Sequence, residues 1–256
     1  MCIPLLPFLP LEPRIRQTGA PKVYAAENVI LATGGPAAVY LDSVYPACHT
    51  GSSSLALDAG AEFANLSEWQ YGIASTDFRW NVSGSYQQVL PRYISVDSDG
   101  VEREFLLDYF DDPGDAIKNV FLKGYEWPFD VRKVGGSSYI DLIIYHETVG
   151  LGRAVYMDFR REPTGVTADF SGLDSVAYEY LKNSDALVAT PIARLERMNP
   201  GAIDLYRKNG IDIAKEPLRV AVCAQHNNGG VRIDANWQTN IRGLYAAGEA
   251  AGSLGI

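Results

Sequence analysis

A histidine flanked by amide side chains stands near the end of the chain. The run reads Gln225, His226, Asn227 and Asn228, and the pair Gly229–Gly230 follows it directly. Histidine changes its charge near neutral pH, so it serves as a proton donor or acceptor or orients a carbonyl group. The run predicts His226 and Gln225 as catalytic residues and the two asparagines as substrate contacts. The alternative is a structural turn, because asparagine also adopts left-handed or capping conformations beside glycine.

Three arginines are candidates for holding a carboxylate. They are Arg79, Arg92 and Arg132. A guanidinium group binds a carboxylate through two parallel hydrogen bonds, and we assign Arg79 to the substrate. Each of the three, taken alone, is better explained as an ordinary surface residue.

Two pairs of a thiol and an imidazole lie close together in the sequence. Cys48 precedes His49, and Cys223 lies three residues before His226. Such pairs are found where an imidazole activates a cysteine nucleophile, but spacing alone assigns neither pair a role. The sequence predicts no metal site, since no spacing of cysteine, histidine and carboxylate residues resembles one.

An apolar run near the N-terminus ends abruptly in small residues. Residues 29–32 read Val-Ile-Leu-Ala, and Thr33, Gly34 and Gly35 follow. The continuous apolar run predicts a strand that is buried on both faces. Glycine has no Cβ, so a flat ligand can approach the backbone there, and ligands of open α/β sheets bind at the carboxyl ends of strands. The alternative is a tight strand-to-loop turn without a ligand.

A second segment repeats this pattern near the C-terminus. Residues 243–247 predict a strand, and Gly248 and Glu249 follow it at the start of a predicted helix. Two such segments are much more specific than one. The alternative for Glu249 is a carboxylate that the helix dipole favours at a helix N-terminus.

Together with residues 225–231, these two segments resemble the fumarate reductase and succinate dehydrogenase flavoprotein family, which includes L-aspartate oxidase. In that family an Ala-Thr-Gly-Gly strand and a late Gly-Leu-Tyr-Ala-Ala-Gly-Glu segment contact FAD. The resemblance covers residues 22–75 and 215–256 well and is looser between them, where residues 140–159 still look like the family's cap helix and strand.

The resemblance implies FAD as the cofactor. The contacts that it assigns are Ala32, Thr33, Gly34, Gly35, Thr50, Gly51, Gly248 and Glu249. Thr50 and Gly51 would open a helix whose free N–H groups serve an acceptor on the cofactor. Glu249 would accept a hydrogen bond from a ribityl hydroxyl, and Gly248 would allow a close approach.

The family's dinucleotide-binding motif is missing. The family opens with a strand, a Gly-x-Gly-x-x-Gly turn and a helix that hold the ADP half of FAD, and no such motif occurs here. A βαβ unit needs about 30 residues, more than precede the first apolar strand. The chain also stops before further flavin-contacting residues of the family. We therefore expect an internal piece of a longer flavoprotein.

Three positions depart from the family's catalytic pattern. Gly72 stands where the family has the histidine of Gln-Phe-His-Pro-Thr, and Ile140 stands where it has the arginine that acts as general acid in fumarate reduction. The family's His-Tyr-x-x-Gly-Gly segment appears with its histidine displaced by one residue, at His226. These departures argue against succinate or fumarate as the substrate.

Composition is that of a soluble globular protein. The 256 residues are 47% hydrophobic and 21% charged, and the net charge of −9 argues against non-specific nucleic-acid binding. Three scattered cysteines do not form a disulfide framework, which fits a cytoplasmic location. The first ten residues lack the features of a signal peptide, and no apolar run is long enough to span a membrane.

The predicted fold class is α/β with an α+β cap: a partial Rossmann-like FAD-binding domain with an inserted capping domain. We expect residues 1–69 and 218–256 to form the FAD-binding domain and residues 70–217 to form the cap, which would bind the substrate. Helices are expected at 52–64, 140–149, 175–182, 191–195 and 200–209, and an acidic loop at 110–115. Strands are expected at 22–26, 29–32, 89–96, 154–159, 218–224, 229–234 and 243–247.

The sequence therefore predicts an FAD-dependent oxidoreductase that transfers a hydride between the flavin and a small organic substrate, for which a carboxylate is the candidate. A redox partner or a complementing chain is left open. The first alternative is a truncated, non-catalytic piece that binds FAD poorly or only with a complementing chain. The second is a nicotinamide enzyme of plain Rossmann type, against which the missing glycine motif counts.

Overall fold

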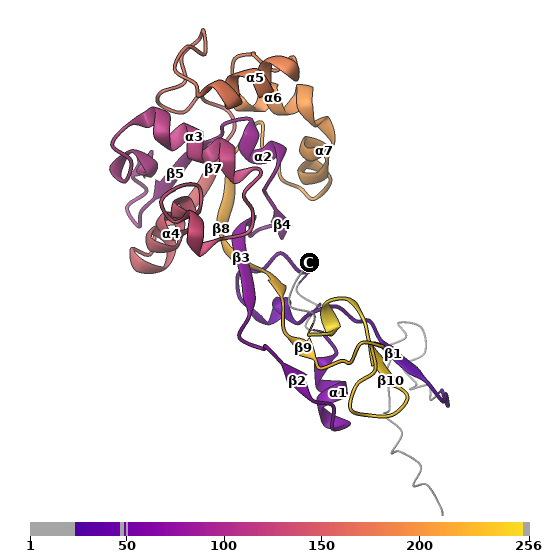
Figure 1. The fold of residues 1–256 in the computed structure, drawn as a ribbon. Helices are drawn as coiled ribbons and strands as arrows, with labels where there is room; N and C mark the ends of the chain where they lie inside the picture. The colour runs from indigo at the N-terminus through magenta and orange to yellow at the C-terminus, as the bar shows by residue number, and fades with distance from the viewer. Residues whose placement is uncertain (1–23, 47–48, 50, 253–256) are drawn as a thin grey trace, which may run out of the picture. The chain divides into compact units, whose positions relative to one another are not determined.

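The computed structural model describes residues 24–46, 49 and 51–252, and the chain divides into two compact units (Figure 1). The first unit comprises residues 1–41, 46–70 and 226–256, and the second comprises residues 42–45 and 71–225. The sequence placed the second boundary at 217/218, whereas the units divide at 225/226. The difference arises because strand β8, Leu218–Asn227, pairs with β7 (Ala154–Asp158) in the sheet of the second unit.

Two short strand pairs form the first unit's framework. β1 (Val29–Leu31) pairs in parallel with β10 (Leu244–Ala246), and β2 (Phe63–Ala64) pairs antiparallel with β9 (Gly230–Val231). The short helical segments are η1 (Ala37–Val39), α1 (Ser53–Asp58) and η5 (Gly248–Ala250). A buried apolar cluster joins the strands to α1 and η5: Leu31, Ala56, Ala61, Val231, Leu244, Ala246, Ala250 and Ala251.

The prediction that the first apolar strand is buried on both faces is wrong. The side chains of Val29 and Ile30 are 39% and 68% exposed, and only Leu31 is buried. Within the described part of the chain, β1 has β10 as its single neighbouring strand. Apolar composition indicates a strand, but it does not fix how many faces the rest of the chain covers.

The helix expected over residues 52–64 is shorter than predicted. α1 ends at Asp58, and Gly60 has a φ of +90°. Glycine adopts this left-handed conformation easily, so the chain reverses there and enters β2. The strand expected at 22–26 is also absent where it can be checked, because residues 24–26 are neither strand nor helix.

A six-stranded sheet carries the second unit, in the order β4-β3-β8-β7-β5-β6. Its remaining strands are β3 (Trp69–Ser75), β4 (Trp80–Asn81), β5 (Arg92–Val96), β6 (Glu102–Arg103) and β7 (Ala154–Asp158). β7 pairs antiparallel with both β5 and β8, with Met157 opposite Tyr93 on one side and Leu218 on the other. The unit boundaries at 70/71 and 225/226 fall within β3 and β8.

The second unit has helices at the four ranges expected from the sequence and further helices that were not expected. They are α2 (Ser85–Gln88), η2 (Phe105–Asp108), α3 (Pro113–Lys123), η3 (Val131–Lys133), α4 (Ser138–Tyr145) with the π-helical turn η4 (His146–Gly150), α5 (Ser175–Asn183), α6 (Pro191–Met198) and α7 (Pro200–Lys208). The acidic loop expected at 110–115 is wrong at its end. Asp112 accepts a hydrogen bond from the backbone N–H of Gly114 and caps α3, and Pro113 occupies the first helical position.

The second unit has a large apolar core. Its fully buried members include Tyr93, Phe105, Ile140, Ile144, Val155, Met157, Phe159, Leu195, Tyr206 and Ile213. Ile140 therefore packs in this core from α4. The resemblance assigns this position to a catalytic arginine, whereas the isoleucine side chain is buried in the core.

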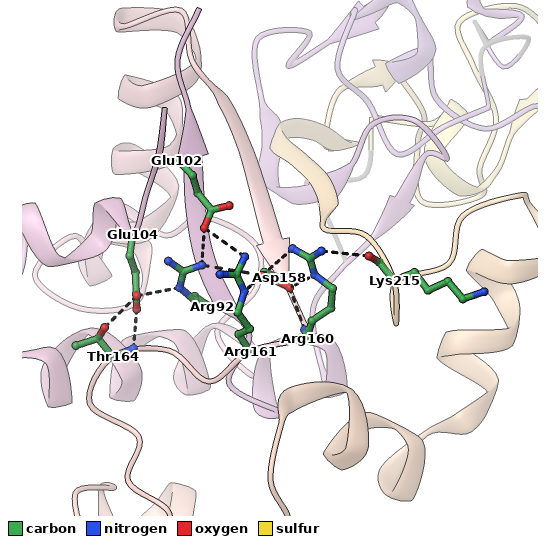
Figure 2. A network of polar contacts seen from close by, with 8 residues as sticks. All are labelled: Arg92, Glu102, Glu104, Asp158, Arg160, Arg161, Thr164 and Lys215. Carbon is green, nitrogen blue, oxygen red and sulfur yellow. Dashed lines mark hydrogen bonds and ion pairs between the residues drawn. The ribbon is translucent and has the colours of Figure 1, made fainter. Parts of the chain in front are cut away.

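An ion network fastens the ends of β5, β6 and β7 (Figure 2). Asp158 is fully buried. The Arg160 side chain donates two hydrogen bonds to it, at 2.7 and 3.0 Å, and the Arg160 backbone N–H donates a third, at 2.9 Å; Arg161 lies 3.3 Å away. Arg92 lies 4.0 Å from Asp158 and donates to Glu102 and Glu104. Burial disfavours the ionised carboxylate of Asp158, but the hydrogen bonds from Arg160 and the charge of Arg161 outweigh burial and hold its pKa below the usual value.

Candidate functional site

The end of β1 presents bare backbone. Ala32 is exposed, and Gly34 has a φ of +73°. The Nε2 atom of His49 lies 2.9 Å from the carbonyl oxygen of Thr33, and a Cβ on Gly34 would lie 2.6 Å from the same nitrogen. His49 thus packs against one side of this turn and leaves no room for a side chain at position 34.

Glu249 ties this turn to two other segments of the first unit. Because β1 and β10 run in parallel, the residues after each strand lie at the same edge. The carboxylate of Glu249 accepts hydrogen bonds from the backbone N–H of Gly35, at 3.2 Å, and of Asn227, at 2.7 Å. A Cβ on Gly35 would lie 2.2 Å from Glu249 Oε1. The two segments that the sequence singled out therefore meet here, and a side chain at position 35 would displace the Glu249 carboxylate.

His226 lies beside the same carboxylate. Its Nδ1 is 3.5 Å from Glu249 Oε1, and the two side chains are 15% and 10% exposed. Nε2 of His226 is buried and has no hydrogen-bond partner among the described residues. The hydroxyl oxygen of Thr33 is likewise buried and has no hydrogen-bond partner among these residues. Buried polar atoms without a partner are uncommon and point to a missing ligand or water.

The two predicted asparagines are engaged in local structure. Asn227 is buried, and its side-chain oxygen accepts a hydrogen bond from the N–H of Gly229 at 2.7 Å. The side-chain oxygen of Asn228 accepts a hydrogen bond from Gln70 at 2.9 Å. These hydrogen bonds are those of a structural turn, which is the alternative interpretation of residues 225–230.

Gln225 and Arg79 belong to the second unit, whereas His226 belongs to the first. Gln225 is buried and accepts a hydrogen bond from Asn81 at 3.0 Å. Arg79 donates to the carbonyl oxygen of Tyr45 at 2.9 Å. Both side chains are thus anchored within the second unit.

Gly72, in β3, faces an indole. A Cβ at this position would lie 2.7 Å from Nε1 of Trp127 and 3.3 Å from Nε2 of Gln225. The indole Nε1 is buried and has no hydrogen-bond partner among the residues that the structure describes. Trp127 thus fills the space that a side chain at position 72 would need, and nothing in the sequence pattern pointed to it.

The other sequence candidates lie outside this group of contacts. Thr50 and Cys48 lie outside the described residues; Gly51 has a φ of +69° just before α1. Burial raises the pKa of the Cys223 thiol to about 12, which makes it a poor nucleophile. Arg132 pairs with Asp130 at 2.8 Å on the surface. No role was predicted for His49 from the sequence. Its position directly before Thr50 and Gly51, two predicted cofactor contacts, was the sequence signal that could have indicated one.

The edge formed by Thr33, Gly35 and Glu249 fits the FAD that the resemblance implies. Among the residues that the structure describes, the Thr33 hydroxyl has no hydrogen-bond partner. Gly248, with a φ of +64°, has no described atom within 4 Å of the place where a Cβ would stand. The open space beside Gly248 and the unsatisfied hydroxyl of Thr33 suit a polar cofactor, whereas His49 and Glu249 occupy the space beside Gly34 and Gly35. Within the described residues, no group of histidine, cysteine and acidic side chains could hold a metal ion, and no helix has the length and apolar character needed to cross a membrane.

Comparisons with known proteins identify the family of the chain. The FAD binding domain family matches residues 10–255. L-aspartate oxidase of Synechocystis sp. is 26% identical over 239 residues, which is 92% of this chain and 35% of the oxidase. The chain thus spans about a third of the length of the curated relatives that it matches.

Solved structures show the same fold. A quinol-fumarate reductase is 22% identical with a TM-score of 0.53, and it is matched over 89% of this chain and 34% of that chain. Sdh1 of Mycobacterium smegmatis is 17% identical with a TM-score of 0.54, over 91% and 32%. The chain belongs to the FAD binding domain family, within the group of fumarate reductase and succinate dehydrogenase flavoproteins that includes L-aspartate oxidase.

Proposed function

We propose that this chain forms the flavin-facing part of an FAD-dependent oxidoreductase that acts on a small organic substrate. The observation that carries the proposal is the junction at Glu249, where the residues after β1 and β10 meet. These are the two segments by which the family contacts FAD. Membership of the FAD binding domain family supports the cofactor.

The cofactor would be held by the edge just described. Ala32, Thr33, Gly34 and Gly35 offer backbone and a hydroxyl on one side; Gly51, Gly248 and Glu249 are the remaining described candidates, and Thr50 completes the set. When bound, FAD supplies the acceptor or donor of two electrons, which side chains alone cannot provide.

His226 is the candidate for proton transfer. Its Nε2 atom has no hydrogen-bond partner within the described part of the chain, and its Nδ1 atom faces Glu249. This is the arrangement of an imidazole that exchanges a proton through one nitrogen. Gln225, Asn227, Asn228 and Arg79 remain proposals as residues that act on or contact the substrate. The engagement of their side chains in other hydrogen bonds makes His226 the stronger candidate.

A small carboxylate is the proposed substrate class, supported by relatives named for L-aspartate and fumarate. Neutral residues at positions 72 and 140 argue against succinate and fumarate themselves. We also propose that the second unit acts as a cap over the cofactor, on the likeness of residues 140–159 to the family's cap. The acidic balance and the three scattered cysteines support a cytoplasmic location.

Anaerobic reduction tests the proposal. The full chain is loaded with FAD and mixed with L-aspartate, succinate or a panel of other small carboxylates, and the bleaching of the visible flavin band is followed. We expect one amino or hydroxy acid to bleach the band, and His226→Ala to slow bleaching by about 10²-fold or more, as for loss of a general base. A flavin-loaded chain that no member of the panel reduces would support the non-catalytic alternative.

A further inference from the structure

The two imidazole nitrogens of His226 have different surroundings. Nδ1 lies 3.5 Å from Glu249 Oε1, whereas Nε2 is buried without a partner among the described residues. A neutral imidazole carries its proton on one nitrogen only, and the neighbour of each nitrogen decides which one. A carboxylate beside Nδ1 favours the proton there.

Glu249 is itself fixed before it meets the histidine. Oε1 accepts from the N–H of Asn227 at 2.7 Å, and Oε2 accepts from the N–H of Gly35 at 3.2 Å. Hydrogen bonds from two backbone segments hold the carboxylate plane in place. The 3.5 Å separation from Nδ1 exceeds an ordinary hydrogen bond of about 2.7–3.2 Å, so the imidazole must rotate toward Oε1 before Nδ1–H can donate to it.

We propose that Glu249 is a positioning residue for His226: it holds the proton on Nδ1 and leaves Nε2 as the proton acceptor. A carboxylate that fixes the tautomer of a histidine is the same physical device that orients a catalytic base or a metal-binding imidazole. This gives Glu249 a role in addition to its proposed contact with the cofactor.

The proton step balances within this pair. The N–H or O–H bond of a substrate group breaks, its electron pair stays on the substrate atom, and a new N–H bond forms at Nε2 of His226. The resulting imidazolium keeps its Nδ1–H directed at Glu249, whose negative charge offsets the new positive charge. The identity of the proton donor rests on the proposed function, but the tautomer does not.

Nitrogen NMR on the full chain tests the tautomer directly. The chain has three histidines, and His49→Asn and His146→Asn variants assign the remaining signals. We expect a protonated-type signal for Nδ1 of His226 and an unprotonated-type signal for Nε2. A wild-type chain with the proton on Nε2 overturns the proposal, even where no Glu249 variant folds.

Variants of Glu249 test the cause. Glu249→Gln keeps a side-chain oxygen as acceptor, so we expect it to retain the Nδ1–H form, whereas Glu249→Ala should shift the tautomer ratio by about tenfold or more. Circular dichroism checks that each variant folds. Glu62→Gln, on an exposed carboxylate of the same unit that pairs with Arg232, is the matched control and should leave the signals unchanged. An unchanged ratio in folded Glu249→Ala contradicts the proposal.

The outcome separates this inference from the proposed function. A chain that shows the Nδ1–H tautomer but binds no FAD sinks the proposed function and leaves the His226–Glu249 pair intact. A chain that binds FAD but shows the Nε2–H tautomer contradicts the role of Glu249 as a positioning residue and leaves the proposed function intact.

Discussion

At the scale of single residues, Gly35 offers a sharp test of the site. A Cβ at this position would lie 2.2 Å from Glu249 Oε1, so Gly35→Ala forces the carboxylate away from the two backbone N–H groups that it accepts. We expect the free energy of unfolding to fall by about 2 kcal/mol and FAD affinity to drop. Gly135→Ala, where a Cβ meets nothing within 4 Å, is the control. Equal urea midpoints for the two variants would contradict this account of Glu249.

Gly72 gives a second prediction at this scale. Gly72→Ala would place a Cβ 2.7 Å from the indole nitrogen of Trp127, and the large ring must shift. Overpacking of this kind costs about 1–3 kcal/mol, which thermal or urea unfolding measures. Gly136→Ala, with its nearest contact at 3.5 Å, should have a much smaller effect. A variant at position 72 as stable as the wild type would show that Trp127 does not fill this space.

Sequence reasoning reached some of these residues and missed others for physical reasons. Gly35 and Glu249 were found because small residues after apolar strands mark a ligand edge. Trp127 was missed because it contacts Gly72 from 55 residues away in the sequence, and no local pattern reports such a contact. The structural alternative for Asn227 was visible in the sequence, but only its hydrogen bond to Gly229 shows how the side chain is engaged.

At the scale of secondary-structure elements, a buried ion pair joins α3 and α4. Lys123 and Asp141 form an ion pair and are 1% and 2% exposed. Removing one partner of such a pair leaves an unpaired buried charge, so Lys123→Met should lower the free energy of unfolding by about 3–5 kcal/mol. The double variant Lys123→Met/Asp141→Leu should recover most of this loss. Urea unfolding measures both, and a double variant no better than the single one would contradict the explanation.

The carboxyl group of Asp141 also makes the free energy of unfolding depend on pH. Burial raises the pKa of Asp141 from 3.8 to about 6, although the charge of Lys123 opposes the shift. A raised folded-state pKa means that the folded state binds the proton more tightly. The stability that this group contributes is therefore fully present below about pH 4 and is lost as the pH rises through about 6.

Comparison with Asp141→Asn isolates this effect. We expect the stability of the wild type relative to the variant to decrease between pH 4 and pH 6, by on the order of 1–2 kcal/mol. Unfolding curves at several pH values measure it. A relative stability that increases over this range would contradict the sign.

Element prediction succeeded where capping residues and apolar patterns agree. The helices expected at 175–182 and 200–209 correspond to α5 and α7, capped by Asp174 and Asn199. It failed at residues 59–64, where Gly60 reverses the chain, and at β1, whose apolar side chains are largely exposed. Local sequence indicates an element's type, while its ends and its burial depend on distant neighbours.

At the scale of the whole molecule, the family followed from two motifs far apart in the sequence. β1 and β10 are separated by more than 200 residues, yet they pair in parallel, with Leu31 opposite Ala246. The mixed helix and sheet fold matches FAD-binding flavoproteins, as the sequence predicted. The six-stranded order of the second unit was not predictable, because strand partners are set by long-range packing.

Retention of FAD by the full chain tests the central claim most directly. The chain is purified with excess FAD, separated from free cofactor by gel filtration, and measured for absorbance in the visible flavin band, with Gly35→Ala and Gly135→Ala prepared alongside. We predict that the wild type and Gly135→Ala retain the cofactor and that Gly35→Ala loses most of it. A wild-type chain that retains no flavin, or a Gly35→Ala variant that retains as much as the wild type, would contradict the assignment of the flavin site to this edge.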